Sequence, residues 1–227
     1  MNRGSLLAVP YRRTDNVVRK LAVRREAILA AAQGLAAEGG MAAVQIAAVA
    51  ERAGIAAGTV YRYFPSKSAL VTALVEALSQ AEVAALARAA DAAPGPLSAL
   101  AAAITAYAAR ALSRRRLAFA LIAEPVEPDV DAARVAYRRV LVGAFETRIR
   151  AALATGQLPD QDPAVAAPAL IGALIEGLVG PLAADASDAG RARAKVQALT
   201  LFGLRALGIV DARARGLVVQ TVMPSPD

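Results

Sequence analysis

Residues 46–64 read IAAVAERAGIAAGTVYRYF, and this stretch predicts two short helices joined by a tight turn. Ile46 and Val49 recur at helical spacing, which predicts the buried face of the first helix. Gly54 permits the left-handed backbone conformation that ends a helix, and it would allow the two helices to approach closely. We therefore expect a helix-turn-helix between Gln45 and Phe64.

The second helix of this pair combines small residues with hydroxyl and cationic side chains. Gly58 and Thr59 open it, and its exposed face is expected to carry Tyr61, Arg62 and Tyr63. A recognition helix needs small residues where it enters the major groove and hydroxyls or cations where it meets phosphates. The pattern therefore indicates DNA binding.

Basic residues are concentrated in the same part of the chain. Residues 1–67 carry ten Lys and Arg against four Asp and Glu, a net charge of +6, whereas the rest of the chain carries only +1. Neutralising phosphates releases counterions and supplies most non-specific affinity for nucleic acid. An anionic membrane surface is the competing partner for such a charge.

No stretch of the sequence predicts a leader segment or a membrane span. Leu6–Val9 is too short for the apolar part of a signal peptide, and Ala92–Ala109 is interrupted by two prolines and a glycine. We therefore expect a cytoplasmic protein with no membrane partner.

The composition argues against most enzyme designs. Cysteine and histidine are both absent, which excludes thiol nucleophiles, imidazole acid–base chemistry and Cys/His zinc sites. Acidic residues crowd around Pro125 and Pro128, where we expect a solvated loop and a helix start rather than a catalytic pair. These residues are Glu124, Glu127, Asp129 and Asp131. We expect no catalytic residue, metal or cofactor.

Alanine-rich segments with apolar residues every three or four positions predict an all-α protein, and glycine and proline mark the helix ends. The nine expected helices cover 19–38, 45–53, 59–64, 66–93, 97–112, 114–123, 129–155, 164–184 and 189–208. They divide into a DNA-binding domain at 19–66, a linker helix at 66–93 and a body at 94–209. Residues 1–18 and 212–227 are expected to be tails, and Leu217–Val222 could pair as a short strand.

The stretch 46–64 also closely resembles the signature of the TetR family of transcriptional regulators. The similarity continues through PSKSALVTALVE at 65–76 and back into REAILAAAQGLAAEGG at 25–40. Its most specific part is the combination of Ala53-Gly54, Gly58-Thr59-Val60-Tyr61, Phe64 and Ser66-Lys67. The resemblance implies a nine-helix TetR-like fold, a homodimer on a two-fold double-stranded DNA operator and a small-molecule effector.

By this resemblance, the helix that begins near Thr59 enters the major groove. Tyr61 contacts a phosphate, and Lys67 reaches another phosphate from the start of the next helix, where the helix dipole favours anions. The further contacts by position are Gln45, Ala57, Gly58, Thr59 and Tyr63. From their charge, we also expect Arg62 to contact the DNA and Arg24 and Arg25 to make weaker phosphate contacts.

The chain departs from the family pattern at two helix starts. Family members usually carry Ser or Thr where this sequence has Gln45 and Ala56, so we expect weaker helix caps. The head should then depend more on packing against Leu70 and Leu74. Ala57 stands where the family often has lysine, which removes one phosphate contact.

Several of these residues have a plainer explanation. Phe64, and to a lesser extent Tyr61, could be core aromatics of a small helical head. Arg52 and Arg62 could be solvated surface charges. The basic residues around the predicted first helix start could solubilise the chain or lie in the minor groove; these are Arg12, Arg13, Arg19 and Lys20.

Small residues recur in the last two expected helices, where they would let helix backbones approach closely. They could serve packing within the chain or, as the resemblance implies, an isologous four-helix dimer interface. The expected interface residues are Gly172, Gly177, Gly180, Leu199, Phe202 and Gly203.

The resemblance also implies a ligand pocket among the middle helices. The candidates, each of which could serve the core or surface instead, are Tyr107, Arg110, Phe119, Tyr137, Phe145 and Glu176. Glu176 is the only charge between Asp162 and Asp185. It could be a buried carboxylate that selects a cationic or hydrogen-bonding ligand, or a rim residue of the dimer.

Four functions compete for this sequence: a ligand-responsive repressor, a ligand-dependent activator of the same fold, a helical protein-interaction module and an enzyme. The uneven charge and the helix-turn-helix favour a regulator over the last two. The repressor is the leading interpretation, and the activator remains its alternative.

Overall fold

The computed structural model describes residues 15–184 and 186–224 of the chain. Within these residues the protein is all-helical, with ten α-helices, one 3-10 helix and no strand. The predicted fold class is therefore confirmed. In chain order the elements are α1 (Asp15–Gly39), η1 (Met41–Ala43), α2 (Ile46–Arg52), α3 (Ala57–Tyr63), α4 (Lys67–Asp91), α5 (Pro96–Ser113), α6 (Arg115–Ile122), α7 (Pro128–Ala154), α8 (Pro163–Val179), α9 (Ala189–Ala206) and α10 (Asp211–Gln220).

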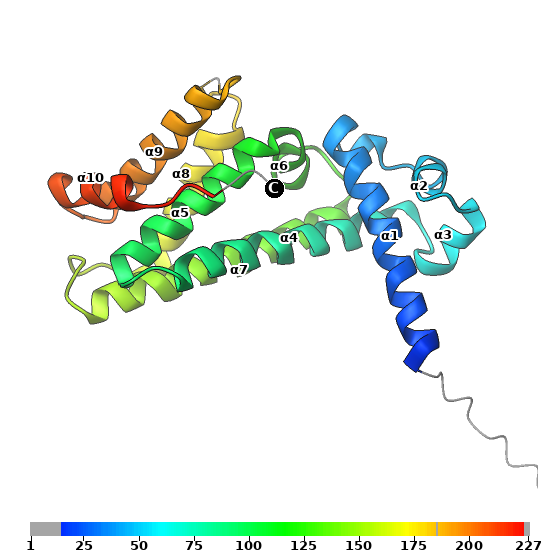
Figure 1. Cartoon of the computed structure of the whole chain (residues 1–227), viewed down its shortest axis with the longest axis horizontal. Coiled ribbons are helices and arrows are strands. Elements are labelled where there is room, and N and C mark those ends of the chain that lie inside the picture. Colours follow the sequence, from blue (N-terminus) through cyan, green and yellow to red (C-terminus); the bar gives the residue numbers. More distant parts are fainter. Residues whose placement is uncertain (1–14, 185, 225–227) are drawn as a thin grey trace, which may run out of the picture.

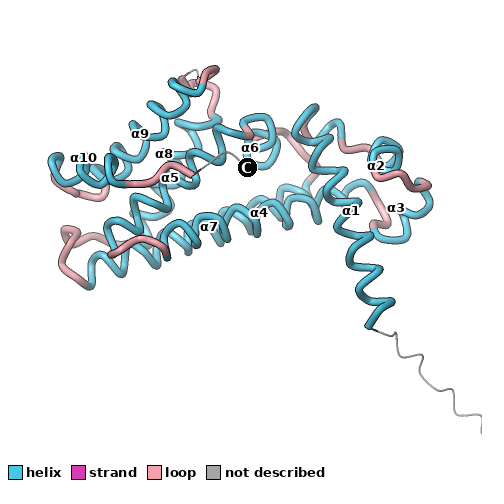
Figure 2. Tube along the Cα trace, in the orientation of Figure 1, coloured by secondary structure: helices cyan, strands magenta, loops and turns pink. Residues whose placement is uncertain are grey.

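The molecule consists of a small head and a larger body (Figure 1). Helices α1, α2 and α3 form the head around Ile28, Val49 and Val60, none of which is exposed to solvent. The body contains α5 to α10, and α4 and α7 run side by side along it. Short loops join most of these helices (Figure 2).

Helix α4 belongs to both parts of the molecule. It buries Leu70 and Leu74 near its start and Leu78 and Leu86 farther along, and it packs on α1 of the head and on α5 and α7 of the body. The helix is long and apolar enough to cross a membrane by length and composition alone, but its packing on three neighbouring helices is typical of a core helix. It contains no glycine or proline, so it is continuous from head to body.

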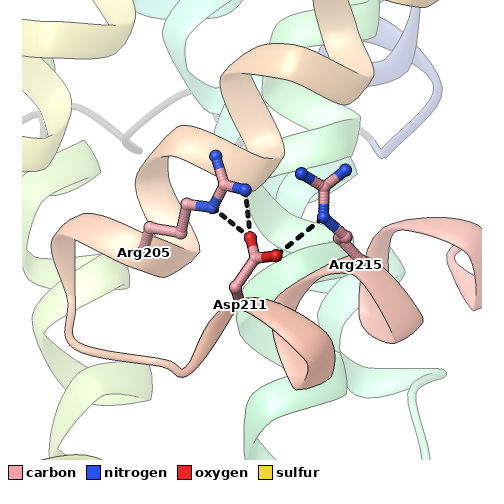
Figure 3. Close-up of polar contacts among 3 residues, drawn as sticks. All are labelled: Arg205, Asp211 and Arg215. Carbon is pink, nitrogen blue, oxygen red and sulfur yellow. Dashed lines mark hydrogen bonds and ion pairs between the residues drawn. The ribbon is translucent and has the colours of Figure 1, made fainter.

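The prediction of a patternless tail from residue 212 is wrong, as is the suggested strand at 217–222. Both segments lie largely in α10, which packs on α9 and α5. Asp211 in the first turn accepts hydrogen bonds from Arg215 Nε at 2.8 Å and Arg205 Nε at 2.7 Å (Figure 3). Both hydrogen bonds lower the pKa of Asp211, and the bond from Arg215 has the larger effect. Asp211 interacts favourably with the dipole at the start of α10 and pairs with Arg205 of α9. These interactions help to stabilise α10, whose apolar pattern is weak.

The other tail is also shorter than predicted, because α1 already begins at Asp15. Residues 1–14, with Arg12 and Arg13, lie outside the described part of the chain. The remaining helix boundaries agree with the predictions to within a few residues, with the largest difference at the end of α8, where Gly180 follows Val179.

A buried hydrogen bond joins α5 to α9 inside the body. Thr105 Oγ1 and Thr200 Oγ1 lie 3.0 Å apart, and Thr200 also donates to the carbonyl oxygen of Val196 at 2.9 Å. Since Thr200 has one hydroxyl hydrogen, Thr105 is the donor between the two. Both polar groups are thus satisfied within the core.

Candidate nucleic-acid interface

The turn between α2 and α3 has the backbone that the sequence predicts. Gly54 adopts a φ of +64°, and the amide of Ile55 donates to the carbonyl oxygen of Ala50 at 3.0 Å. A Cβ atom at Gly54 would meet no atom within 4 Å. Glycine is favoured here because of the left-handed conformation. The predicted close approach of the two helices at Gly54 is wrong, since a side chain there would have room.

The weak helix caps are confirmed. Gln45 and Ala56 are the N-caps of α2 and α3, and neither side chain accepts a capping hydrogen bond. Gln45 instead donates from Nε2 to the carbonyl oxygen of Ala42 at 2.9 Å. In contrast, Ser66 Oγ accepts from the amide of Ala69 at 3.0 Å and caps α4.

Helix α3 presents one exposed face. Val60 is fully buried and anchors the helix to the head, whereas Ala57, Gly58, Tyr61 and Arg62 are exposed. Tyr61 has 53% of its surface accessible, so its plainer explanation as a core aromatic is wrong. Small residues thus come first along this face, and a hydroxyl and a guanidinium group follow one turn later.

The residues around this face include more cations. Arg24 and Arg25 are exposed on α1, and the Arg25 guanidinium lies 5.3 Å from the centre of the Phe64 ring. Phe64 itself is only 3% exposed, so its interpretation as a core residue is confirmed. Lys67 occupies the first position of α4 and is half-buried.

Other candidates have partners within the head. Arg52 Nη2 lies 2.6 Å from Glu38 Oε2, which joins α2 to α1 and lowers the pKa of Glu38. This ion pair supports the plainer explanation of Arg52 as a surface charge. Thr59 and Tyr63 are half-buried, and Gln45 is exposed.

Three of the ligand candidates meet in the body. Tyr107, Arg110 and Tyr137 line a cavity of about 20 Å³ enclosed by α4, α5, α6 and α7. The hydroxyls of both tyrosines are buried and lie beside each other. Burial raises the pKa of both; the charge of Glu82 adds to this effect at Tyr107, and the Tyr107 hydroxyl adds to it at Tyr137. Each hydroxyl has at most the other as a partner, and one hydrogen bond uses only one of the two hydroxyl hydrogens, so the pair keeps hydrogen-bonding capacity for a ligand.

Glu82, which was not among the predicted ligand residues, lies beside these hydroxyls on α4. Its carboxylate accepts from Arg110 Nε at 2.9 Å and from Arg110 Nη2 at 2.8 Å, a two-point pairing between α4 and α5. The two residues are 28 positions apart, so local sequence spacing does not predict their pairing.

The other three ligand candidates lie elsewhere. Phe145 is fully buried in the core, and Phe119 is half-buried on α6 outside the lining of the cavity. Glu176 is exposed on α8, so the alternative of a buried carboxylate is wrong and the rim alternative remains.

The expected dimer residues divide into two groups. Gly203 is buried, and a Cβ there would lie 2.9 Å from Leu170 and 3.2 Å from Ile104, so its prediction as an interface residue is wrong. A Cβ at Gly177 would lie 2.7 Å from Leu199 Cδ2 of the same chain, and one at Gly180 would collide with the Glu176 side chain. Gly172 is exposed with open space around it, and Phe202 is 52% exposed.

Glu124 corrects the prediction of a solvated acidic loop. Its carboxylate accepts from the amides of Met41 at 3.0 Å and Ala42 at 3.4 Å, which belong to the head. Asp129 and Asp131 do lie in the first turn of α7, as expected for a helix start. Glu127 is exposed.

Comparison with known proteins agrees with this geometry. The profile described as "Bacterial regulatory proteins, tetR family" matches residues 28–74, from the buried face of α1 to α4. A stretch of 57 residues is 58% identical to the HTH-type transcriptional repressor KstR of Rhodococcus jostii and covers 25% of this chain and 26% of KstR. The chain therefore spans about a quarter of the length of the curated relatives it matches.

Solved structures extend the similarity over the body. RolR in complex with resorcinol matches 92% of this chain and 100% of its own, with a TM-score of 0.66 and 25% identity. The fatty acid degradation regulator FadR of Bacillus halodurans matches 82% of this chain and 97% of its own, with a TM-score of 0.71 and 18% identity, which shows a shared fold. Residues 28–74 therefore form a DNA-binding domain of the TetR family of bacterial regulatory proteins, and the body shares its fold with RolR and FadR.

Proposed function

We propose that this chain is a transcriptional repressor that binds double-stranded DNA as a homodimer and releases it when a small molecule enters the body. The observation that carries the proposal is the exposed face of α3, with Ala57 and Gly58 leading to Tyr61 and Arg62. Small residues permit entry into the major groove, and the hydroxyl and cation that follow suit phosphates and base edges. We assign the protein to the cytoplasm, where it meets its operator.

The cations around α3 support a grip on the DNA backbone. Arg24, Arg25 and Arg62 are exposed, and Lys67 lies at the start of α4, where the helix dipole adds to its charge in attracting a phosphate. Repression is favoured over activation because the head is similar in sequence to that of KstR, which is named as a transcriptional repressor. The chemistry is binding rather than catalysis.

The exposed surface of α8 and α9 supports pairing of two copies. Val165, Ala169 and Gly172 lie along one face of α8, and Phe202 lies among small exposed residues on α9. An exposed apolar face of this kind marks an interaction site in a protein that must present two heads to a two-fold operator. We propose that this face, without Gly203, forms the dimer interface.

The cavity between α4, α5, α6 and α7 supports a ligand site. Its apolar lining with two adjacent buried hydroxyls and one ion pair is typical of small-molecule recognition. Its volume of about 20 Å³ admits no more than a water molecule, so a ligand must displace a wall. RolR, which shares this fold, has been crystallised with resorcinol, a small diphenol that could pair with such hydroxyls.

Substitutions at Tyr61 and Lys67 test the DNA contact. Duplexes selected from a random library by the purified protein provide the operator. Tyr61→Ala and Lys67→Ala should weaken binding to selected and unrelated duplexes alike, because phosphate contacts carry no sequence information. Lys67→Ala should also reduce the slope of log affinity against log salt by about 1.

Arg139→Ala is the matched control, because Arg139 is exposed on α7 in the body and the change removes the same charge. It should leave both the affinity and the salt slope unchanged. Affinity that does not fall with rising salt would exclude the proposed phosphate contacts.

Phe202→Glu tests the dimer interface. Burying an unpaired carboxylate in an apolar contact is costly, so sedimentation velocity should show a monomer. Affinity for a two-site duplex should fall about 100-fold once the two heads are no longer joined. Val219→Glu is the control, since Val219 is 82% exposed on α10 and should leave the dimer intact. A dimer that persists in Phe202→Glu would locate the interface elsewhere.

Resorcinol serves as the probe of the cavity. Its binding should lower affinity for the selected duplex by about 10- to 100-fold, and the free dimer should bind it more tightly than the DNA complex by the same factor. Tyr107→Phe should remove the response while retaining duplex affinity, because it deletes one hydroxyl from an otherwise unchanged cavity. Equal affinity of resorcinol for the free and DNA-bound protein would contradict an effector site there.

A further inference from the structure

The head is attached to the body at a second place besides α4. Glu124, which follows α6, accepts hydrogen bonds from the amides of Met41 and Ala42 at the start of η1, at 3.0 and 3.4 Å. Arg116, at the start of α6, donates from Nη2 to the carbonyl oxygen of Gly39 at 3.0 Å. The Glu124 carboxylate thus accepts hydrogen bonds from backbone amides that follow α1, and the Arg116 guanidinium donates one to the last carbonyl group of α1. Charge strengthens both contacts.

Gly40 lies between these two side chains and lets them approach. Its φ of +76° is a left-handed conformation, and a Cβ at this position would collide with the Glu124 carboxylate and lie 2.6 Å from Arg116 Nη2. The junction between α1 and η1 is therefore shaped to receive Glu124 and Arg116, and a side chain at Gly40 would push them away.

Glu124 is held in place from the body side. Arg134 of α7, only 5% exposed, donates from Nη1 to the main-chain oxygen of Glu124 and from Nη2 to that of Ala120. Arg138 donates from Nη2 to the carbonyl oxygen of Ile122 at 3.1 Å. Two cations of α7 therefore bind the last carbonyls of α6, where the helix dipole favours them.

The opposite face of α6 forms a wall of the cavity described above. Leu117, Leu121 and Ile122 line it together with Tyr107 and Tyr137. Helix α6 is the shortest of the four wall helices, with 8 residues against 18 to 27 in α4, α5 and α7. A ligand that enlarges the cavity would move this helix most readily. The same movement would pull Arg116 and Glu124 away from the head.

We propose that Glu124 and Arg116 are positioning residues that form a latch, fixing the direction of the head relative to the body so that two heads match the two half-sites of an operator. The inference rests on the proposed DNA-binding function and describes how that function is regulated. With the latch closed, α3 has one orientation; with α6 displaced, the head is held by α4 alone. The latch thus connects the cavity to the spacing of the two recognition helices.

The test measures affinity as a function of half-site spacing. The duplex selected by the wild-type protein is compared with versions carrying two inserted or deleted central base pairs, which turn one half-site by about 70° around the duplex. The wild-type dimer should lose about 100-fold in affinity on the altered duplexes, because both heads can no longer bind at once. Glu124→Ala should lose no more than about tenfold, since a freed head can follow the displaced half-site.

Two further variants separate the latch from a general loss of structure. Glu124→Gln keeps the shape and one acceptor, and its spacing profile should lie between those of wild type and Glu124→Ala. Glu127→Gln is the control, because Glu127 is exposed in the same loop, and its profile should match wild type. In hydrogen exchange, the amides of Met41 and Ala42 should lose protection in Glu124→Ala, while that of Phe64, bonded to Val60 in α3, keeps it.

The outcomes distinguish the two proposals. A wild-type protein that selects no duplex would overturn the proposed function itself. A wild-type protein that selects a duplex, with Glu124→Ala losing affinity by the same factor at every spacing, would overturn the latch, because a merely destabilised head has no reason to favour altered spacings. A broadened spacing profile with exchange confined to Met41 and Ala42 supports it.

Discussion

Helix α4 is the element on which the rest of the structure depends, because its side chains join the head and the body in one continuous hydrophobic core. Leu70 and Leu74 near its start and Leu78 and Leu86 farther along are all buried in this core. A head of three short helices has little core of its own, and the caps of α2 and α3 contribute no side-chain hydrogen bond. Packing against α4 therefore stabilises the fold of the DNA-binding surface as well as attaching it to the body.

A single rigid connection would leave the head free to pivot about the start of α4. The contacts of α6 with the junction of α1 and η1 supply a second point of attachment, and two points define an orientation where one does not. Helix α6 also lines the cavity. Its position therefore affects both the orientation of α3 and the volume available to a ligand. This arrangement gives a physical basis for coupling between ligand and DNA.

The head was the most predictable part from sequence, because its signals are local. Gly54 specifies a left-handed turn, Ser66 caps the next helix, and Val60 and Phe64 follow the apolar spacing of a buried face. The exposure of Tyr61 agrees with its predicted role, and the absence of side-chain caps at Gln45 and Ala56 follows directly from the residue types.

The features that sequence analysis missed depend on residues far apart in the chain. Glu124 and Met41 are 83 residues apart, so nothing around Pro125 indicates that this acid binds the head. Helix α10 has a weak apolar pattern and depends on Arg205 of α9. Small residues predict close helix packing but not its partner, which is why Gly203 was assigned to a dimer interface although it packs against Leu170 and Ile104 of its own chain.

In the proposed complex, two copies of α3 lie in successive major grooves on one face of a duplex. Dimethyl sulfate footprinting tests it most directly, because this reagent methylates guanine N7 in the major groove and adenine N3 in the minor groove. We expect two segments of protected guanine N7 positions with centres separated by about one helical turn, or a multiple of it. Protection confined to adenine N3, or spread evenly along the duplex, would contradict it.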